Sequence, residues 1–159
     1  MNNNNLVTVL ILSKFGQAIK FKGIEFLTVL TSKQFHKGEF IKLSKLDKQA
    51  ASLIYSEDGT KEVLYMTSKG FGARILLSSI RIMGVGGPGV SFAKVGAETG
   101  EVFGLIESSD LGKLKIITTK KKIMIGMKEI PIIQRGRAPV QIVKLEDHEK
   151  IIDIKYIKE

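Results

Sequence analysis

The sequence predicts an all-β fold: an array of about three four-stranded blades, propeller-like, forming an open arc or a partial ring. Three observations favour it. The chain repeats a unit of roughly 50 residues. Each unit holds about four short runs rich in Val, Ile, Leu and Phe, separated by turn signals such as Asp58-Gly59 and Thr99-Gly100. No window sustains a 3.6-residue period long enough for an ordinary helix, although a single helical turn over residues 24–33 stays open.

The repeat is marked first by a hydroxyl residue that ends an apolar run and precedes a basic turn. Ser13, Thr67 and Thr118 hold this position, at intervals of 54 and 51 residues. A second landmark recurs at intervals of 52 and 50 residues, in the segments GEFIKL from Gly38, VSFAKV from Val90 and VQIVKL from Val140. Because the two landmarks keep the same order and nearly the same period, they indicate three copies of one β-unit.

The repeat sets the expected domain organisation. With 43% hydrophobic and 26% charged residues, the 159-residue chain is typical of a globular protein large enough to bury a core. We expect a disordered Asn-rich tail at residues 1–5 and a single domain over residues 6–159, with units at 6–59, 60–110 and 111–159. No run approaches the roughly 18 apolar residues of a membrane helix.

Composition excludes several classes of site. The chain has no cysteine, so it forms neither disulfides nor thiolate metal sites, and it suits a reducing cytoplasm. Its two histidines, His36 and His148, are far apart and have no second ligand at metal spacing. The serines have no histidine placed to activate them. We therefore expect no metal, no cofactor and no catalytic residue.

The charge pattern points to a polyanionic partner. The net charge is +9, and a basic protein is attracted to polyanions by a field that needs no specific contact. Residues 1–59 carry a net +3, residues 60–110 are neutral, and residues 111–159 carry +6. Most basic residues are lysines, which suit phosphates and carry little base readout, so any nucleic-acid binding should be largely indifferent to sequence.

One segment of each of the last two units resembles a known family. Gly70 to Val90 reads GFGARILLSSIRIMGVGGPGV, and its length and glycine spacing resemble the blade segment G-Y-G-K-R-T-P-L-S-E-Y-R-V-Q-G-R-G-G-K-G-V of the C-terminal domain of the DNA gyrase A subunit. Lys128 to Ile154, KEIPIIQRGRAPVQIVKLEDHEKIIDI, is similar to the ending of the family's blades. The resemblance covers nearly the whole chain after Asn5 and implies the β-pinwheel of type IIA topoisomerase A subunits, of either gyrase or topoisomerase IV.

The resemblance implies a partner and a set of binding residues. Family members bend or wrap duplex DNA around the basic rim of the pinwheel. The candidate DNA-binding residues of this chain are then Lys14, Lys20, Lys33, Lys69, Arg74, Arg81, Lys120, Lys121, Lys122, Arg135 and Arg137.

The box loop of the gyrase family, Q-R-R-G-G-K-G, is degenerate in this chain. It falls on Met83, Gly84, Val85, Gly86, Gly87, Pro88 and Gly89, which keep three of its glycines and none of its basic residues. The loop is not a phosphate-cradling nucleotide motif, because no Gly-Lys-Ser/Thr follows it. Tight wrapping of the gyrase kind is thereby placed in question, and weaker bending of the topoisomerase IV kind is equally compatible.

The expected function is non-specific duplex DNA binding and bending by a non-catalytic part of a DNA topoisomerase, in the cytoplasm at the nucleoid. The topoisomerase core, or further blades in trans, would be its protein partners; homo-oligomerisation stays open, and no membrane is expected. The alternative is a propeller-type protein-interaction module, or a degenerate remnant without DNA affinity. The neutral middle unit and the lost box residues favour that alternative.

Overall fold

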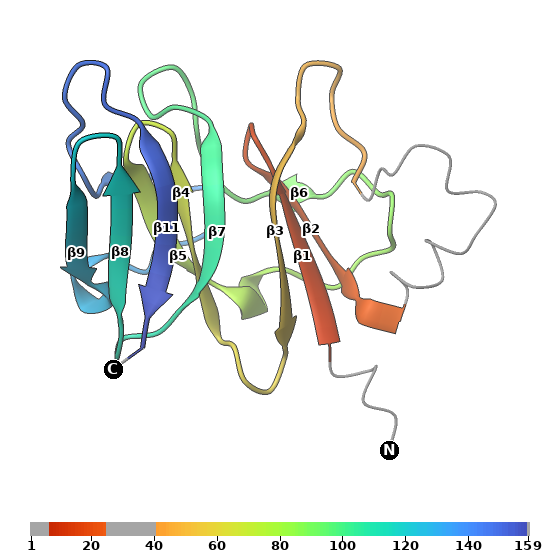
Figure 1. Ribbon diagram of the computed structural model, residues 1–159. Coiled ribbons are helices and arrows are strands. Elements are labelled where there is room, and N and C mark those ends of the chain that lie inside the picture. Colours follow the sequence, from red (N-terminus) through yellow and green to blue (C-terminus); the bar gives the residue numbers. More distant parts are fainter. Residues whose placement is uncertain (1–6, 25–40, 159) are drawn as a thin grey trace.

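The computed structural model describes residues 7–24 and 41–158, and in it the chain forms three antiparallel sheets side by side in an open row (Figure 1). The predicted all-β class is confirmed. The tail at residues 1–5 and Lys33 lie outside the described residues. Of the helical turn left open over residues 24–33 only Ile24 is described, and it is helical.

The first sheet has the order β3-β1-β2-β6, the second β10-β5-β4-β7 and the third β11-β8-β9. The strands are β1 (Val7–Ser13), β2 (Gln17–Lys22), β3 (Gln49–Ser56), β4 (Glu62–Thr67), β5 (Phe71–Leu76), β6 (Val90–Ser91), β7 (Val102–Ser108), β8 (Lys113–Thr118), β9 (Lys122–Gly126), β10 (Val140–Gln141) and β11 (Ile151–Ile157). Two 3₁₀ turns, η2 (Leu77–Ser79) and η3 (Met127–Glu129), follow β5 and β9.

Each of the last two units donates a short strand to the sheet of the unit before it, an arrangement that we call strand exchange. The two-residue strand β6 belongs to the second sequence unit but pairs with β2 of the first sheet, and β10 of the third unit pairs with β5 of the second sheet. Two sheets therefore have the predicted four strands. The third has three among the described residues, because no described segment supplies its fourth.

Glycine is required where a donated strand crosses the hairpin turn of its host sheet. Gly16 and Gly70 have φ of +92° and +89°. A Cβ on Gly16 would lie 1.9 Å from the carbonyl oxygen of Ala93, and one on Gly70 would lie 2.3 Å from that of Val143. Because only glycine fits this conformation and this approach, the repeated glycine of the turn follows from strand exchange.

The core lies between the sheets. Leu10 and Leu12 of the first sheet pack with Val63 and Tyr65 of the second, and the opposite face of the second sheet packs against the third. Every residue of β4, the central strand of the second sheet, is buried, so this sheet packs on both of its faces. The burial pattern follows from its position between two others.

The row of sheets has two different edges. We call the upper edge in Figure 1 the hairpin edge; it holds the three hairpin turns and the loops that enter β3, β7 and β11, namely residues 13–17, 67–71, 118–122, 41–48, 92–101 and 142–150. The opposite edge holds the β3–β4 and β7–β8 connections and the two 3₁₀ turns. No helix within the described parts of the chain is long and apolar enough to cross a membrane.

Candidate nucleic-acid interface

The hairpin edge is built by one hydroxyl in each turn. Ser13 Oγ donates to Asp47 Oδ2 at 2.7 Å and accepts the N–H of Gln17 at 2.9 Å. In the second blade, Thr67 Oγ1 donates to the carbonyl of Thr99 and accepts the N–H of Phe71. The hydroxyl thus ties the turn to the loop that enters the outer strand, which explains the recurrence of Ser or Thr.

The third blade, like the first, ties the hydroxyl of the turn to a carboxylate. Thr118 Oγ1 donates to Glu149 Oε2 and accepts the N–H groups of Lys120 and Lys121 at 3.1 and 3.0 Å. The N–H of Glu146 donates to Glu149 Oε1 at 2.9 Å. These hydrogen bonds, first that from Glu146 and then that from Thr118, hold the pKa of Glu149 below its ordinary value.

Lysines lie exposed on these anchored turns. Lys69 Nζ donates to the carbonyl of Ala97 at 2.5 Å, Lys120 Nζ lies 3.2 Å from Glu146 Oε2, and Lys121 Nζ lies 3.6 Å from Glu149 Oε1. The predicted residues Lys69, Lys120, Lys121 and Lys122 are all exposed, and Lys14 is half-buried. The structure therefore brings these five predicted residues to one edge.

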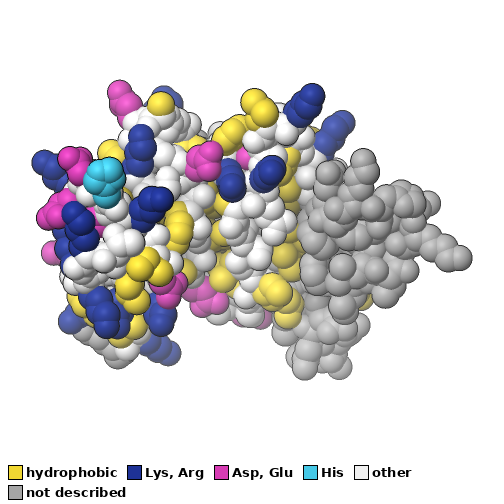
Figure 2. All heavy atoms as spheres, turned by 45° about the horizontal axis from the view of Figure 1, so that its top comes forward, with side chains coloured by type: hydrophobic (Ala, Val, Ile, Leu, Met, Phe, Trp, Pro, Cys, Tyr) yellow, Lys and Arg dark blue, Asp and Glu magenta, His cyan; other side chains and the backbone are white. Residues whose placement is uncertain are grey.

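Sequence reasoning missed another set of lysines at this edge. The loops that enter the outer strands carry the exposed residues Lys42, Lys45, Lys48, Lys94, Lys144 and Lys150. Three of them could have been found, because Lys42, Lys94 and Lys144 are the lysines of the second repeated landmark. Figure 2, which brings the hairpin edge forward, shows Lys and Arg side chains spread along the row with fewer acidic ones among them. The turns and loops of this edge together carry 11 lysines against 6 Asp and Glu residues.

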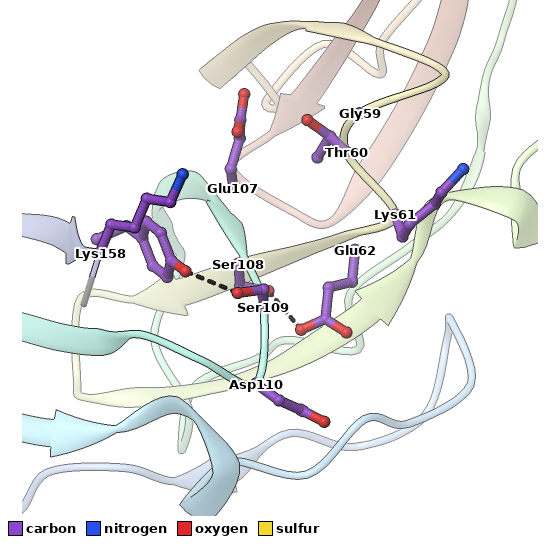
Figure 3. Close-up of a pocket in the computed structure, with 10 residues that line it drawn as sticks. Gly59, Thr60, Lys61, Glu62, Glu107, Ser108, Ser109, Asp110 and Lys158 are labelled. Carbon is purple, nitrogen blue, oxygen red and sulfur yellow. Dashed lines mark hydrogen bonds between the residues drawn. The ribbon is translucent and has the colours of Figure 1, made fainter.

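The opposite edge is different in charge. A hollow of about 370 Å³ there is lined by Glu62, Glu107 and Asp110 together with two lysines, Lys61 and Lys158. In Figure 3, dashed lines join Ser108 to Glu62 and Ser109 to the hydroxyl of Tyr156, at 3.0 and 2.7 Å. Arg74 pairs with Glu62 and Asp110, so this hollow has mixed charge and no excess of positive charge, and the hairpin edge is the better candidate for a nucleic acid.

Lys20 lies at the junction between the first and second blades, not at the surface. It is 4% exposed. Its Nζ donates to the carbonyls of Leu77 and Ile80 at 3.1 Å each, and it pairs with Glu57 Oε1 at 3.1 Å. These partners use all three ammonium donors, and they join β2 to the 3₁₀ turn η2 of the next unit.

Arg74 does the same at the next junction. It is 4% exposed; Nε donates to the carbonyl of Ile130 at 2.8 Å, and Nη1 lies 2.7 Å from Glu62 Oε1 and 2.6 Å from Asp110 Oδ1. Burial opposes its charge, but the hydrogen bonds with Asp110 and Glu62 outweigh it and raise the pKa of Arg74. We therefore assign Lys20 and Arg74 a structural role and leave them out of the candidate interface.

The remaining predicted arginines are exposed but lie away from the turns. Arg81 follows η2. Arg135 donates from Nε to the carbonyl of Ser79 at 3.0 Å and from Nη1 to that of Ser91 at 2.8 Å, which fastens its loop to the preceding unit. Arg137 Nε lies 3.4 Å from Gln134 Oε1.

The degenerate box loop packs against the first blade. Met83 and Val85 contact the apolar cluster of Val9, Ile11, Ile19, Phe21 and Ile41. The carbonyl of Gly87 accepts the N–H of Lys42 at 2.7 Å. Gly86 and Gly89 have positive φ, so the retained glycines preserve a backbone shape. The loop has no basic side chain, and the contacts of Met83 and Val85 with the first blade are apolar.

The described residues contain no group of three or more His, Cys, Asp or Glu side chains that could hold a metal. The buried polar side chains named above serve the turns and junctions, whereas the hydroxyl of Tyr65 is buried without a hydrogen-bond partner.

Comparisons with known proteins agree with this architecture. No family model matches the chain. The chain is 29% identical over 139 residues to the DNA gyrase A subunit of Rickettsia prowazekii (strain Madrid E), covering 84% of this chain and 15% of that protein. It is 28% identical over 147 residues to the DNA gyrase A subunit of Helicobacter pylori (strain ATCC 700392 / 26695), covering 91% and 17%. The chain thus spans about a sixth of the length of these curated relatives.

Solved structures share the fold. The C-terminal domain of DNA topoisomerase IV superposes with a TM-score of 0.76 at 14% identity, covering 97% of this chain and 47% of that one. The DNA gyrase A C-terminal domain superposes with a TM-score of 0.58 at 14% identity, covering 98% and 67%. The β-pinwheel fold, and the resemblance to the C-terminal domains of type IIA topoisomerase A subunits predicted from the glycine spacing, are therefore both confirmed.

Proposed function

We propose that the chain binds duplex DNA without sequence preference along its hairpin edge and bends it, as the C-terminal-domain part of a type IIA topoisomerase A subunit. The observation that carries the proposal is the exposed lysines at one edge of three successive blades. Strand passage would belong to a catalytic core outside this chain, so the domain supports changes of DNA topology without being catalytic. It would act at the nucleoid.

Charge and chemistry support a backbone-directed interaction. Duplex DNA carries one negative charge per roughly 1.7 Å of its axis, and proteins that neutralise phosphates release condensed counterions. The edge offers lysines, whose ammonium groups contact phosphates as point charges and read little base sequence. Binding should therefore be strong at low salt and indifferent to sequence.

The repeat supports bending. Equivalent lysines of the three blades, such as Lys42, Lys94 and Lys144, provide successive contact points along the row. Bending a short duplex by 40–90° costs on the order of 1–6 kcal/mol, which several phosphate contacts can offset. The same contacts therefore supply both affinity and the force that curves the duplex.

The test is a titration of fluorescent duplex DNA at several salt concentrations, with two unrelated sequences of equal length. We expect equal affinities for both sequences and a log-log salt slope of about 0.9 per phosphate contacted. Replacing Lys69, Lys120 and Lys121 by Gln should lower the slope by about three units on both sequences. A fluorescence energy-transfer change between the labelled ends of the duplex would report bending.

The matched control removes the same charge from the opposite edge, as Lys61, Lys128 and Lys158→Gln. This control should keep the salt slope of the unmodified protein. If the two triple variants lose affinity equally, the effect belongs to net charge and the proposed edge is wrong. If the unmodified protein binds neither duplex at low salt, the protein-interaction alternative replaces the proposal.

A further inference from the structure

The third sheet ends the described row, and its outer face is unlike the corresponding faces of the other two. The register pairs Lys115 with both Met124 and Lys155, and Ile117 with both Lys122 and Asp153, so these side chains share one face. The opposite face carries Leu114 and Ile116, which are buried against the second sheet. The face with the lysines therefore points away from the rest of the molecule.

The corresponding face of the first and second sheets holds a neighbouring blade. By register, the position of Lys115 is Leu10 in the first sheet and Leu64 in the second, both fully buried. The position of Lys155 is likewise Leu53 in the first sheet and Ile106 in the second. Lysine at two positions that pack a neighbouring blade shows that this face is not made to bury one.

The outer edge of β9 is also unsuited to a donated strand. The position of Lys122 is Ala18 in the first sheet and Gly72 in the second. A Cβ on Gly72 would already lie 2.8 Å from the side chain of Ile142, next to the donated strand. A lysine on an edge strand is a common device against strand addition. Met124, which is 51% exposed, occupies the position that Arg74 has in the second sheet. The third sheet therefore has no basic side chain at the position from which Arg74 binds the next unit.

The arrangement of charge on this face opposes folding. Lys115 and Lys155 lie directly opposite each other on adjacent strands, and like charges in that position are destabilising. The ion pair recorded on the face joins Lys155 to Asp153 at 3.8 Å, and both side chains are about half exposed or more. An anion laid across the face would neutralise a repulsion that the fold leaves standing.

We propose that the outer face of the third sheet, centred on Lys115, Lys122 and Lys155, is a second phosphate-binding surface that receives duplex DNA as it leaves the hairpin edge. This inference rests on the proposed function. Continuity favours DNA over another polyanion, because Lys120 and Lys121 lie in the hairpin turn and Lys122, the next residue, opens β9 on this face. The lysines thus continue along the chain from the hairpin turn onto this face.

The test compares two double variants in the salt titration of a duplex long enough to pass the third blade. Lys115→Gln with Lys155→Gln should lower the log-log salt slope by about two units and weaken binding at 0.1 M salt by roughly tenfold or more. Lys61→Gln with Lys158→Gln, which removes equal charge from the hollow at the opposite edge, should change neither quantity. The thermal midpoint of the first variant should equal or exceed that of the unmodified protein, because a like-charge pair has been removed.

The outcomes separate the two proposals. Suppose that the unmodified protein binds DNA, that the Lys115/Lys155 variant has the same salt slope as the unmodified protein, and that the Lys69/Lys120/Lys121 variant has a lower one. The proposal of a second surface is then wrong, and the proposal of the hairpin edge stands. If the unmodified protein does not bind DNA, both fall. The same variants are also tested for binding to vesicles that contain phosphatidylserine. If the Lys115/Lys155 variant loses binding to these vesicles while its binding to DNA is unchanged, the face binds a membrane surface and the inference is overturned.

Discussion

Basic side chains lie at two kinds of place in successive blades of this molecule, and the two regions use them in opposite ways. At the blade junctions, Lys20 and Arg74 are buried and hold carbonyls of the next unit and acidic side chains. On the hairpin edge, Lys69, Lys120 and Lys121 are exposed and make contacts within their own blade. The first set joins blades to each other, and the second set is available to a ligand.

The cross-strand neighbours of a basic residue distinguish a junction residue from an edge residue; its recurrence in successive blades does not. Lys20 and Arg74 lie opposite Leu10 and Leu64, on faces that the next blade covers. Glu57 and Asp110, which occupy equivalent positions after the third strand of their sheets, complete the clamp. A periodic lysine or arginine therefore indicates a shared structural position, and its partners decide whether that position is a junction or a binding surface.

The largest expected effect is that of Arg74→Met, which gives the second blade the residue that the third has at Met124. The change leaves the nearly buried carboxylate of Glu62 without its cation and the carbonyl of Ile130 without its donor. We expect the free energy of unfolding to fall by about 3 kcal/mol. Urea denaturation measures it.

A milder variant controls this change. Arg74→Lys keeps a positive charge near Glu62 and should lose less stability than Arg74→Met. DNA affinity per folded molecule should be unchanged in both variants. An Arg74→Met protein of normal stability with weakened DNA binding would return Arg74 to the interface.

Lys20→Met at the first junction should cost less. Its acidic partner Glu57 keeps 38% of its side chain exposed and also accepts from Thr8 Oγ1 at 3.0 Å, so the carboxylate that is left behind stays solvated. The lost contacts are then mainly two carbonyl hydrogen bonds, and we expect a decrease of about 2 kcal/mol in the free energy of unfolding. An effect larger than that of Arg74→Met would contradict this comparison of the junctions.

Acidification should weaken both regions, because each contains a carboxylate with a lowered pKa. The Arg74 guanidinium lowers the pKa of Asp110 below its usual 3.8, and hydrogen bonds from Glu146 and Thr118 lower that of Glu149 below 4.5. A carboxylate whose pKa is lowered by folding stabilises the protein above its unfolded pKa, and the contribution is lost as pH falls through the folded pKa. Stability should thus be level near neutral pH and fall in acid.

Asp110→Asn and Glu149→Gln test this at the junction and at the hairpin edge respectively. Each should lower the thermal midpoint at neutral pH and flatten its decline in acid, with the midpoint of each variant approaching that of the unmodified protein as pH falls through the lowered pKa of the carboxyl group that was replaced. A variant that declines as steeply as the unmodified protein would show that its carboxylate is not a source of the acid sensitivity.

Much of this fold could be predicted, and the reasons for the failures are specific. The Ser13, Thr67 and Thr118 recurrence located the hairpins, because each turn needs a hydroxyl to bind its own backbone and the neighbouring loop. Strand exchange could not be predicted from the units alone, since β6 and β10 are two residues long and nothing in the landmark segments that they begin tells which sheet they join. The glycines that permit the exchange were visible, but their reason requires the donated strand.

The candidate interface was predictable in part. Lys69 and Lys120 could be identified from their place in basic turns, and Lys42, Lys94 and Lys144 were visible as a repeated residue whose place in space was unknown. That Lys20 is buried at a junction could not be predicted, because a sequence does not tell which face of a strand a neighbouring blade covers. Its burial depends on contacts with a turn 57 residues further along the chain.

The smallest expected effect on stability is that of the triple variant Lys69, Lys120 and Lys121→Gln. Exposed ion pairs contribute little, so losing the contacts of Lys120 with Glu146 and Lys121 with Glu149 should change the free energy of unfolding by less than about 0.5 kcal/mol. Glu149 keeps its hydrogen bonds from Glu146 and Thr118, which hold its charge in place. Urea denaturation of this variant beside Arg74→Met therefore separates the two regions: a loss above about 1 kcal/mol would mean that the edge lysines also hold the fold, and that their effect on DNA binding could not be assigned to contact with phosphates.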